Sequence, residues 1–378
     1  MTVRPASRFE GIEISLIRQM QSLATPLSIH LSLGEPNIAP DTRMRDHAIE
    51  VAARGSWKYT PNAGILELRR RLAESEAAHY DPESEICVTA GTEEGLHAIF
   101  QAYIGAGDEV LVPDPGFVSY PALTRMAGGE PRPYPLDPDG WTIDFEALEA
   151  AWSPRVKAVV VNSPSNPTGG VIGESHLRKL LDLAESRGAL VISDEVYGAI
   201  HYGGSPPPSL KGRGDHVIVV SGLSKSHAMT GLRIGWVLAA AETLKPVIKA
   251  HQYIATCASS FSQELATRLL ADSEWNEEWL SSVRTRMREQ RDAAVEAARK
   301  WLEVEVQPPE GAFYLFVPVP VCGTAELAKK LAIEALVLTI PGVAFGSRGE
   351  GFLRISYATE IESIRKGIER IGRFLVSC

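Results

Sequence analysis

The sequence predicts an α/β protein whose large domain contains a mostly parallel central sheet, joined to a smaller α+β domain. The first observation is the periodicity from about residue 65, where short continuous apolar runs alternate with amphipathic helices. Runs of this kind, such as 156–161, are typical of parallel strands that are buried on both faces. The second observation is the length of 378 residues, which is too large for one small core and favours two domains.

The elements of the large domain follow from these apolar runs and from the helical spacing between them. Leu66, Leu68 and Leu72 stand among charged positions and indicate an amphipathic helix. The β-branched residues of 156–161 favour a strand. The expected elements are helix 65–80, strand 86–90, helix 93–104, strands 109–112 and 156–161, helix 174–187, and strands 190–193, 217–220 and 234–238.

The pattern changes after about residue 275, where a long charged helix is expected at 278–302. The residues before 44 contain no obvious core strand and are expected to join the smaller domain. We therefore assign 44–275 to the large domain, and 1–43 with 276–378 to the small one. The other elements expected in the small domain are strand 313–317, helix 325–336, strand 352–356 and helix 361–375.

Composition argues against several classes of partner. The net charge is -9 without a clustered basic run, so we expect neither nucleic acid nor a membrane as a partner. No stretch approaches the ~18 uninterrupted apolar residues of a membrane helix, and the first ten residues do not resemble a secretory signal. The cysteines are too far apart for a zinc or redox motif, so we expect no metal and a reducing cytoplasm. They are Cys87, Cys257, Cys322 and Cys378.

Polar residues follow three successive expected strands. Asn166 lies in a polar cluster after strand 156–161, Asp194 and Tyr197 follow strand 190–193, and Lys225 and Arg233 follow strand 217–220. Taken singly, these features suit a turn, a capping carboxylate and a solvated lysine. Ligands of such sheets bind at the carboxyl ends of the strands, where the three loops converge. The sequence therefore predicts one crevice that holds an amide, an acid, an amine and a guanidinium.

A fourth segment, 88–94, runs from a strand through Gly91 and Thr92 into a helix that begins near Glu93. The free N–H groups of a helix N-terminus bind anions. Alone, the segment also suits an ordinary helix start. With Arg233 nearby, a bound phosphate is the better interpretation.

These residues belong to motifs that resemble a known family over nearly the whole chain. The chain resembles the fold-type I pyridoxal-phosphate (PLP) dependent aminotransferases, in the class I group of bacterial aspartate and aromatic aminotransferases. The order and spacing of the motifs together are highly specific. The motifs are LGEP at 33–36, YTPNAG at 59–64, NPTG at 166–169, DEVY at 194–197, SK at 224–225, RIG at 233–235 and RISY at 354–357.

The resemblance implies an enzyme that moves an amino group from an L-amino acid to a 2-oxo acid by a ping-pong mechanism. Lys225 would hold PLP as a Schiff base and then act as general base and acid. Asp194 would pair with the pyridine nitrogen, Tyr197 and Asn166 with the phenolic oxygen, and Phe117 would stack on the ring. The catalytic residues are thus expected to be Lys225, Asp194 and Tyr197.

The resemblance also implies how the cofactor phosphate and the substrate are held. The implied phosphate ligands are Gly91, Thr92, Ser224 and Arg233, with Glu93 contributing at most its backbone N–H. Tyr59 is expected to reach the phosphate of a neighbouring subunit, which implies a homodimer with shared active sites. Arg354 would bind the substrate α-carboxylate through two parallel hydrogen bonds. Gly34 and Asn166 would assist it.

The chain departs from the family pattern at three positions. Gly222 stands where many relatives carry a hydroxyl, so the phosphate loses one ligand or Ser221 replaces it. Phe117 and Leu232 occupy positions that are often tryptophan. None of the three departures removes a chemical role.

Other interpretations remain open at this point. A carbon–sulfur β-lyase would use the same lysine chemistry, and product analysis separates the two activities. A non-catalytic PLP-binding sensor would need an added DNA-binding segment. A nucleotide-binding protein would need a glycine-rich loop, which the sequence does not contain in that context. The amino donor also stays open. A dicarboxylate substrate needs a second cation, which we cannot place from the sequence. The N-terminal segment with Ile12, Ile14 and Ile17 either covers the site, which would favour substrates with apolar side chains, or only packs against the small domain.

Overall fold

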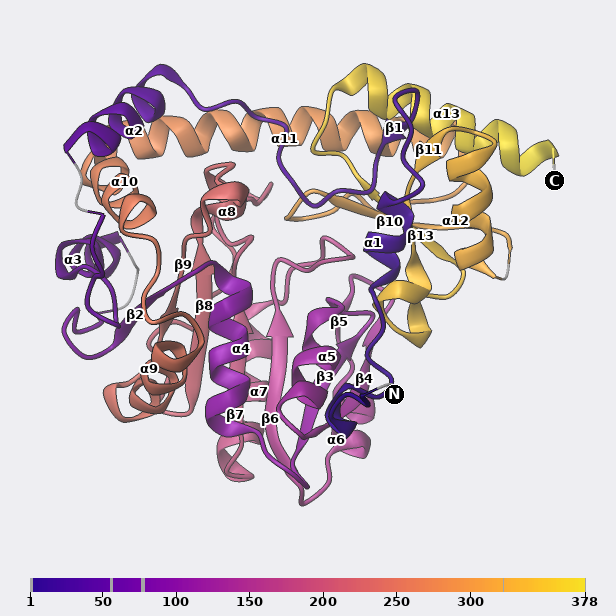
Figure 1. Ribbon diagram of the computed structural model, residues 1–378. Helices are drawn as coiled ribbons and strands as arrows, with labels where there is room; N and C mark the ends of the chain where they lie inside the picture. Colours follow the sequence, from indigo (N-terminus) through magenta and orange to yellow (C-terminus); the bar gives the residue numbers. More distant parts are fainter. Residues whose placement is uncertain (1–2, 55–56, 76–78, 322, 378) are drawn as a thin grey trace.

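The computed structural model describes residues 3–54, 57–75, 79–321 and 323–377. An eight-stranded sheet with the order β2-β9-β8-β7-β6-β3-β4-β5 forms its centre (Figure 1). The strands are β2 (Ile86–Thr89), β3 (Glu109–Asp114), β4 (Glu130–Asp137), β5 (Thr142–Ile143), β6 (Val156–Asn162), β7 (Leu190–Asp194), β8 (Val217–Gly222) and β9 (Gly235–Leu238).

Most of this sheet is parallel, as predicted. β8, β7, β6, β3 and β4 are parallel neighbours, whereas β9 is antiparallel to both β8 and β2, and β5 is antiparallel to β4. In the register of β6 and β7, Asn162 lies opposite Asp194. The carboxyl ends of the parallel strands therefore meet at one edge of the sheet, where the chemistry was expected.

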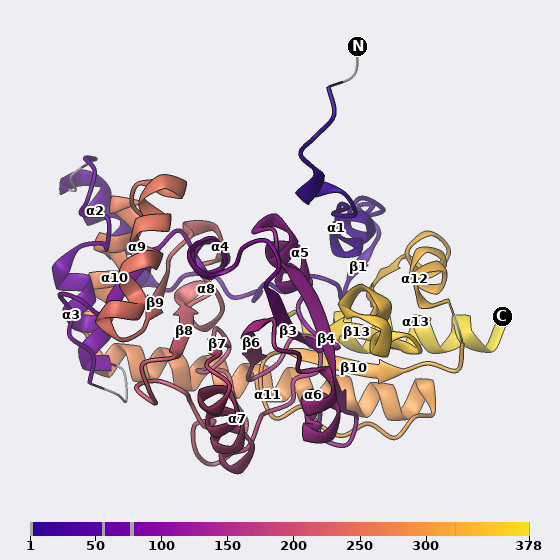
Figure 2. The ribbon, with the colours of Figure 1, turned by 90° about the horizontal axis from the view of Figure 1, so that it is seen from below.

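Helices cover both faces of the sheet (Figure 2). Val110 and Val112 pack into one apolar cluster, and Leu111 between them packs into the other, because successive side chains of a strand point to opposite faces. Burial on both faces explains why these strands are continuous apolar runs in the sequence. One face carries α4 (Thr92–Tyr103), α5 (Ser119–Met126) and α9 (Ala241–Ala255), and the other carries α6 (Phe145–Ala151) and α7 (Glu174–Ser186).

The C-terminal region adds a second, smaller sheet with the order β10-β13-β12, in which both pairings are antiparallel. The N-terminal segment contributes β1 (Ile29–His30), which pairs in parallel with β11 (Val337–Leu338). The other elements here are α1 (Leu16–Gln21), β10 (Tyr314–Pro318), α12 (Thr324–Ile333), β12 (Ile340–Pro341), β13 (Phe352–Ser356) and α13 (Ile361–Ser377), with short 3-10 turns at Ser7–Phe9, Gly342–Phe345 and Ser347–Gly349. A further 3-10 turn, Thr230–Leu232, precedes β9 of the large sheet.

A single long helix, α11 (Ser273–Leu302), runs across both regions (Figure 1). It begins five residues before the predicted start at 278, because the Asp272 carboxylate caps it by accepting a hydrogen bond from the Trp275 N–H. The expected domain boundary at 275/276 therefore falls inside the first turn of this helix.

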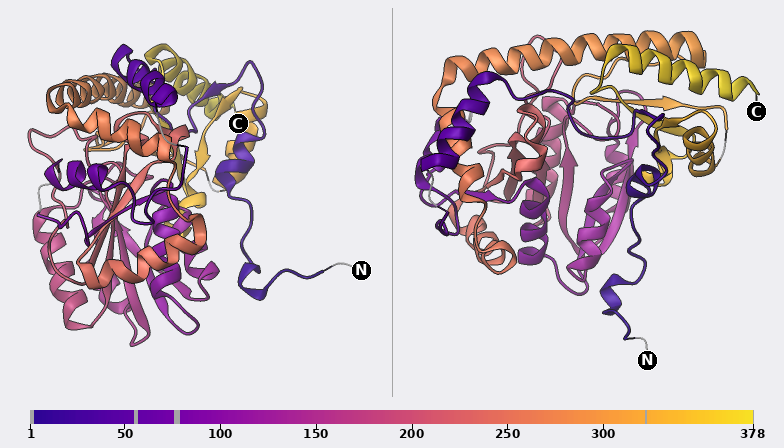
Figure 3. Two further views of the ribbon diagram at one scale, coloured as in Figure 1. Left: turned by 60° about the vertical axis from the view of Figure 1, so that its left-hand side comes forward. Right: turned by 45° about the horizontal axis from the view of Figure 1, so that its top comes forward.

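Several elements escaped the sequence analysis. Strand β4 carries Pro131, Pro133 and Pro135, which argue against a strand when read alone. They occupy every second position, opposite alternate residues of β3, so the intervening N–H groups remain available for pairing. Helices α2 (Thr42–Arg54), α3 (Leu66–Ser75) and α10 (Ser260–Ala271) pack together at one side of the molecule (Figure 3), and of these only α3 was expected.

The chain before α1 leads away from the rest of the molecule (Figure 3). Across the four described stretches of the chain, no helix has both the length and the apolar character that crossing a membrane requires.

Candidate active site

A cleft of about 690 Å³ lies where the carboxyl ends of the parallel strands face the C-terminal region. Most of the site residues expected from the sequence line it, although they come from distant parts of the chain. These are Gly34, Thr92, Glu93, Phe117, Asn166, Asp194, Tyr197, Ser224, Lys225, Arg233 and Arg354.

Asp194 ends β7 and is almost completely buried, with 4% of its surface exposed. The Tyr120 hydroxyl donates a hydrogen bond of 2.8 Å to its Oδ2, and the Val196 N–H donates one of 3.2 Å to its Oδ1. Burial raises the pKa of Asp194 to about 6, and these two hydrogen bonds only partly oppose the rise. The carboxylate therefore lies in a site that favours a cationic partner.

Lys225 lies on the short helix α8 (Leu223–Ser226), which follows β8 directly. Its Nζ donates a hydrogen bond of 2.6 Å to the carbonyl oxygen of Gly34. Burial, followed by the positive charge of Arg354, lowers the pKa of Lys225 to about 8. The amine is therefore easier to deprotonate than an ordinary lysine, as a nucleophile or a base requires.

The helix that carries Lys225 is anchored on its far side to α11. The indole N–H of Trp279 donates a 3.0 Å hydrogen bond to the Ser226 carbonyl oxygen. The buried His227 ring bonds Ser226 Oγ through Nδ1 at 2.9 Å and Asn276 Oδ1 through Nε2 at 2.8 Å. These contacts fix the backbone directly after the lysine.

Tyr197 and Asn166 approach Lys225 and Asp194 from neighbouring loops. The Tyr197 hydroxyl shares a 2.7 Å hydrogen bond with the Tyr314 hydroxyl. The side-chain oxygen of Asn166 accepts a 2.8 Å hydrogen bond from Arg354, which leaves its NH2 group as a donor.

Arg354, on β13, is a buried cation without a carboxylate partner among the described residues. Its two terminal nitrogens donate to Asn166 Oδ1 and to the carbonyl oxygen of Ser32, whereas its buried Nε has no hydrogen-bond partner in the described chain. Its guanidinium lies over the rings of Tyr314 and Phe345, at 4.4 and 4.9 Å from the ring centroids. Burial lowers the pKa of Arg354, and an incoming carboxylate would reverse that penalty.

An anion pocket lies at the N-terminus of α4. Gly91 is the N-cap residue, with φ 85° and no side chain to cap the helix, so the first N–H groups remain available to a ligand. A Cβ at Gly91 would lie 2.5 Å from Arg233 Nη2, and one at Gly235 would lie 2.7 Å from the Thr92 nitrogen. Only glycine therefore allows the guanidinium and the helix end to meet here.

The departure at Gly222 has a packing reason. A Cβ at this position would lie 2.8 Å from the Ile234 carbonyl oxygen and 2.9 Å from the Gly235 Cα. Any side chain at this position would therefore force this backbone apart. Ser221 belongs to β8, opposite Trp236, and is not one of the described residues that line the cleft.

Two predicted residues do not line the cleft. Gly91 lies behind it, against Arg233. Tyr59 is 87% exposed on the surface of this chain. Phe117 does line the cleft and packs edge-on against Tyr120, with 5.7 Å between the ring centroids.

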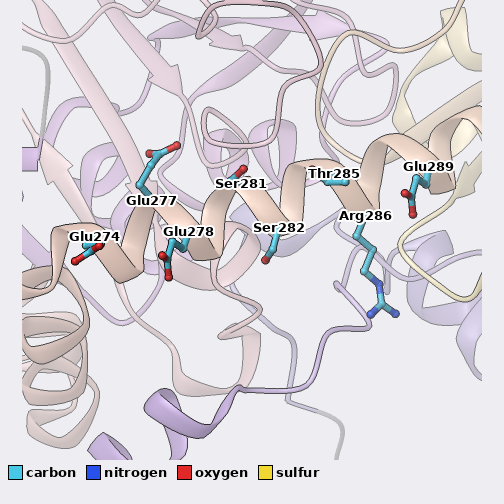
Figure 4. A pocket seen from close by; sticks show the side chains of 8 residues that line it. All are labelled: Glu274, Glu277, Glu278, Ser281, Ser282, Thr285, Arg286 and Glu289. Carbon is cyan, nitrogen blue, oxygen red and sulfur yellow. The ribbon is translucent and has the colours of Figure 1, made fainter.

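A second hollow, of about 770 Å³, runs along α11 (Figure 4). All eight of its lining side chains come from this one helix, and half of them are glutamates. A site for chemistry needs groups that converge from several elements. This hollow is therefore not a candidate active site. Elsewhere in the described chain, no group of three or more histidine, cysteine or acidic residues is arranged to hold a metal ion.

Known proteins with similar sequences and structures point to one family. The family model "Aminotransferase class I and II" matches residues 28–371. The probable aspartate aminotransferase of Methanocaldococcus jannaschii is 37% identical over 377 residues, covering 96% of this chain and 97% of that protein. The aromatic-amino-acid aminotransferase 2 of Thermococcus litoralis is 32% identical, covering 98% of each chain. An aspartate aminotransferase structure from Thermus thermophilus superposes with a TM-score of 0.92 at 32% identity, covering 98% of this chain and 100% of that one.

The chain belongs to the class I and II aminotransferases. It is a PLP-dependent enzyme of fold type I that transfers amino groups. The sequence-based predictions of family, fold, activity and cofactor are therefore confirmed. The relatives described above carry aminotransferase names, which favours transfer over the β-lyase alternative.

The cleft of this aminotransferase fits the cofactor chemically. A phosphate suits the glycine-lined pocket at the α4 N-terminus beside Arg233. A protonated ring nitrogen suits the buried Asp194, and an aldehyde suits the low-pKa amine of Lys225. An acid, an amine and an anion pocket thus line a single cleft.

Several functional residues of the aminotransferase escaped the sequence analysis. Tyr120 lies three residues after Phe117, but nothing in the sequence showed that its hydroxyl would reach Asp194. Tyr314 was seen only as part of an expected strand, although it contacts both Tyr197 and Arg354. Arg18 lines the cleft from a segment that was considered for its isoleucines alone. Among the isoleucines of this N-terminal segment, Ile17 lines the cleft, whereas Ile14 is 74% exposed.

Proposed function

We propose that this aminotransferase accepts L-amino acids and 2-oxo acids whose α-carboxylate binds to Arg354, beside the amine of Lys225. One observation carries the proposal: Arg354 is 2% exposed, yet no carboxylate among the described residues neutralises it. A buried cation without a partner is costly, so its place in the cleft is explained by a substrate anion. Asn166 holds the guanidinium on one side, and the Gly34 backbone adds a polar group to the pocket.

The phosphate end of the cofactor belongs, in this proposal, at the start of α4. Thr92 and Glu93 supply backbone N–H groups there, and Ser224 and Arg233 supply a hydroxyl and a guanidinium. Gly91 contributes by its missing side chain, which lets Arg233 approach, because its own N–H donates to the Thr89 carbonyl oxygen. PLP contributes an aldehyde that takes up the amino group and a conjugated ring that delocalises the electron pair left at Cα. Phe117 provides an apolar wall for that ring.

Lys225 moves the proton. With a pKa near 8, its amine is partly neutral at neutral pH and takes a proton from the substrate Cα as general base. Asp194 would stabilise a positive charge at the ring nitrogen through a charge-assisted hydrogen bond. The Tyr197 hydroxyl and the Asn166 amide would donate hydrogen bonds to the ring oxygen.

The oligomer and the domains complete the proposal. Tyr59 is 87%, Trp57 83% and Tyr253 84% exposed, and exposed aromatic side chains of this size favour burial against another chain. We infer a homodimer in which Tyr59 contacts the phosphate in the partner's site. The large domain comprises residues 44–275, and the small domain comprises 1–43 with 276–378. The free thiols of Cys87 and Cys257 suit a reducing cytoplasm.

A panel of amino donors with 2-oxoglutarate tests the function, with both keto and amino products measured. Transamination gives equal amounts of the two, whereas release of pyruvate and ammonia from cystathionine would point to the lyase and refute the proposal. Asp194→Ala and Lys225→Ala test the roles. We expect each to abolish most turnover, since removal of a buried charged partner costs about 3–5 kcal/mol. Near-normal turnover of Asp194→Ala would contradict the role of Asp194.

A further inference from the structure

One cation of the cleft has no task in the proposed function. Four cationic residues and three carboxylates are among the described residues that line the cleft. Lys225, Arg233 and Arg354 serve the amine chemistry, the phosphate and the α-carboxylate. Arg18 remains, and no motif quoted for the family includes it.

The guanidinium of Arg18 is available to a ligand. The residue is exposed, and its side chain forms no ion pair or hydrogen bond with any residue in the described part of the chain. Ser15 and Ile17 line the cleft from the same segment. An unpartnered arginine at the wall of an amino-acid site suits a carboxylate, which it can bind through two parallel hydrogen bonds.

The position of Arg18 is fixed by the helix that carries it. In α1, Met20 is 1% exposed, and the helix packs against α12 and β12. The side chain of Gln21 hydrogen-bonds to the hydroxyl of Ser32, and the carbonyl oxygen of Ser32 accepts a hydrogen bond from Arg354. Ser32 therefore holds both the helix that carries Arg18 and the guanidinium of Arg354 at the cleft.

The carboxylates of the cleft do not neutralise Arg18. Glu35 accepts a hydrogen bond from the Thr230 hydroxyl, and Asp194 is bonded to Tyr120. Glu93 is exposed in the first turn of α4, and no ion pair between it and Arg18 is found in the described chain. A substrate carboxylate would be repelled by Glu93 and attracted by Arg18, so it would lie on the α1 side of the cleft.

We propose that Arg18 determines specificity by binding the second carboxylate, at the side-chain end, of a dicarboxylic substrate. The inference rests on the proposed function, because it takes the α-carboxylate to be held by Arg354. It supplies the second cation that a dicarboxylate requires, and it assigns the N-terminal segment to substrate recognition.

The test compares kcat/KM of the PLP-loaded Arg18→Gln enzyme for two classes of donor. Loss of one bidentate charged pair lowers kcat/KM for aspartate and glutamate by ~10–100-fold, whereas alanine and phenylalanine change by less than ~3-fold. Arg18→Lys keeps the charge without the planar fork, so its loss is intermediate. Arg8→Gln is the matched control, since it removes an arginine of the same N-terminal segment that does not line the cleft.

Inhibition by simple acids gives a second readout that does not depend on turnover of a dicarboxylate. Succinate should inhibit the wild-type enzyme more strongly than butyrate, and Arg18→Gln should remove most of the difference. An equal loss for all donors would mean that Arg18 supports the fold or the closure of the cleft, and it would overturn the proposal. Normal use of dicarboxylates by Arg18→Gln would also overturn it and leave the aminotransferase function intact. Failure of the wild-type enzyme with every donor would instead refute the proposed function.

Discussion

Replacement of Arg354 by methionine separates what this residue does for the fold from what it does for the substrate. The guanidinium is buried, donates to Asn166 and Ser32, and has no carboxylate partner among the described residues. Methionine has a similar length and can pack against the rings of Tyr314 and Phe345, over which the guanidinium lies.

The two effects have different magnitudes. Replacing a buried ion by a well-packed apolar side chain of similar volume is neutral or stabilising by ~1–4 kcal/mol. The substitution also leaves two oxygens, on Asn166 and Ser32, without their donor, at ~1–3 kcal/mol each. These contributions oppose each other, and their midpoints leave a net destabilisation of ~1.5 kcal/mol relative to wild type. The substrate loses two charge-assisted hydrogen bonds of at least ~1.5 kcal/mol each, which is a loss of ~100-fold or more in kcat/KM.

Urea denaturation of the substrate-free enzyme and steady-state kinetics measure the two quantities. Leu353→Ala on the same strand is the control, because truncation of this fully buried leucine should cost ~2–5 kcal/mol of stability. We expect Arg354→Met to be clearly more stable than Leu353→Ala, although it loses far more activity toward every donor. If Arg354→Met unfolded as easily as the control, the arginine would be a structural residue and our reasoning about its unpaired charge would be wrong.

Three further predictions concern other charges of the molecule. In the apoenzyme, Tyr120→Phe removes a hydrogen bond that lowers the pKa of Asp194, so the pKa of this carboxyl should rise above about 6. An unchanged pKa in an NMR titration of the apoenzyme carboxyls would contradict this. In apoenzyme, trinitrobenzenesulfonate should modify Lys225 faster as the pH rises, with a half-maximal rate near the lysine pKa of about 8, because only the neutral amine reacts. A half-maximal rate near pH ~10, as for an ordinary lysine, would refute the lowered pKa. Burial alone would raise the pKa of Glu109, but the hydrogen bond from Ser153 and the charges of Arg132 and Arg155 lower it. Glu109→Gln should therefore destabilise the protein by ~1–3 kcal/mol at pH 7. Since the folded pKa is depressed, the stability difference should shrink as the pH falls below the ordinary glutamate value of 4.5, and a constant difference in urea denaturation would argue against the ion pair.

The sequence was most informative where structure depends on local pattern. Strands such as β6 and β7 are buried on both faces, so their apolar runs predicted them almost to the residue. The rule that ligands bind at the carboxyl ends of parallel strands then placed Asp194 and Lys225 together, as the structure does.

The contacts that tune these residues could not be predicted, because they depend on tertiary packing. Tyr120 reaches Asp194 across 74 positions of the sequence, and Tyr314 reaches Tyr197 across 117. Tyrosine is common in strands and helices for reasons of packing, so its presence alone signals no such role. The same holds for Arg18, which is an ordinary surface arginine until α1 is placed beside the cleft.

Three ionisable groups of the cleft show how this site is organised. Burial lowers the pKa of Lys225 and of Arg354 and raises that of Asp194, so each charge is disfavoured in the chain alone. Each has a chemical complement in the reaction: an aldehyde for the amine, a substrate carboxylate for the guanidinium, and a cationic ring nitrogen for the acid. Because water is largely excluded, each of these interactions is stronger than it would be at the surface. The burial that weakens the unliganded protein is therefore also what makes the site selective for this combination of groups.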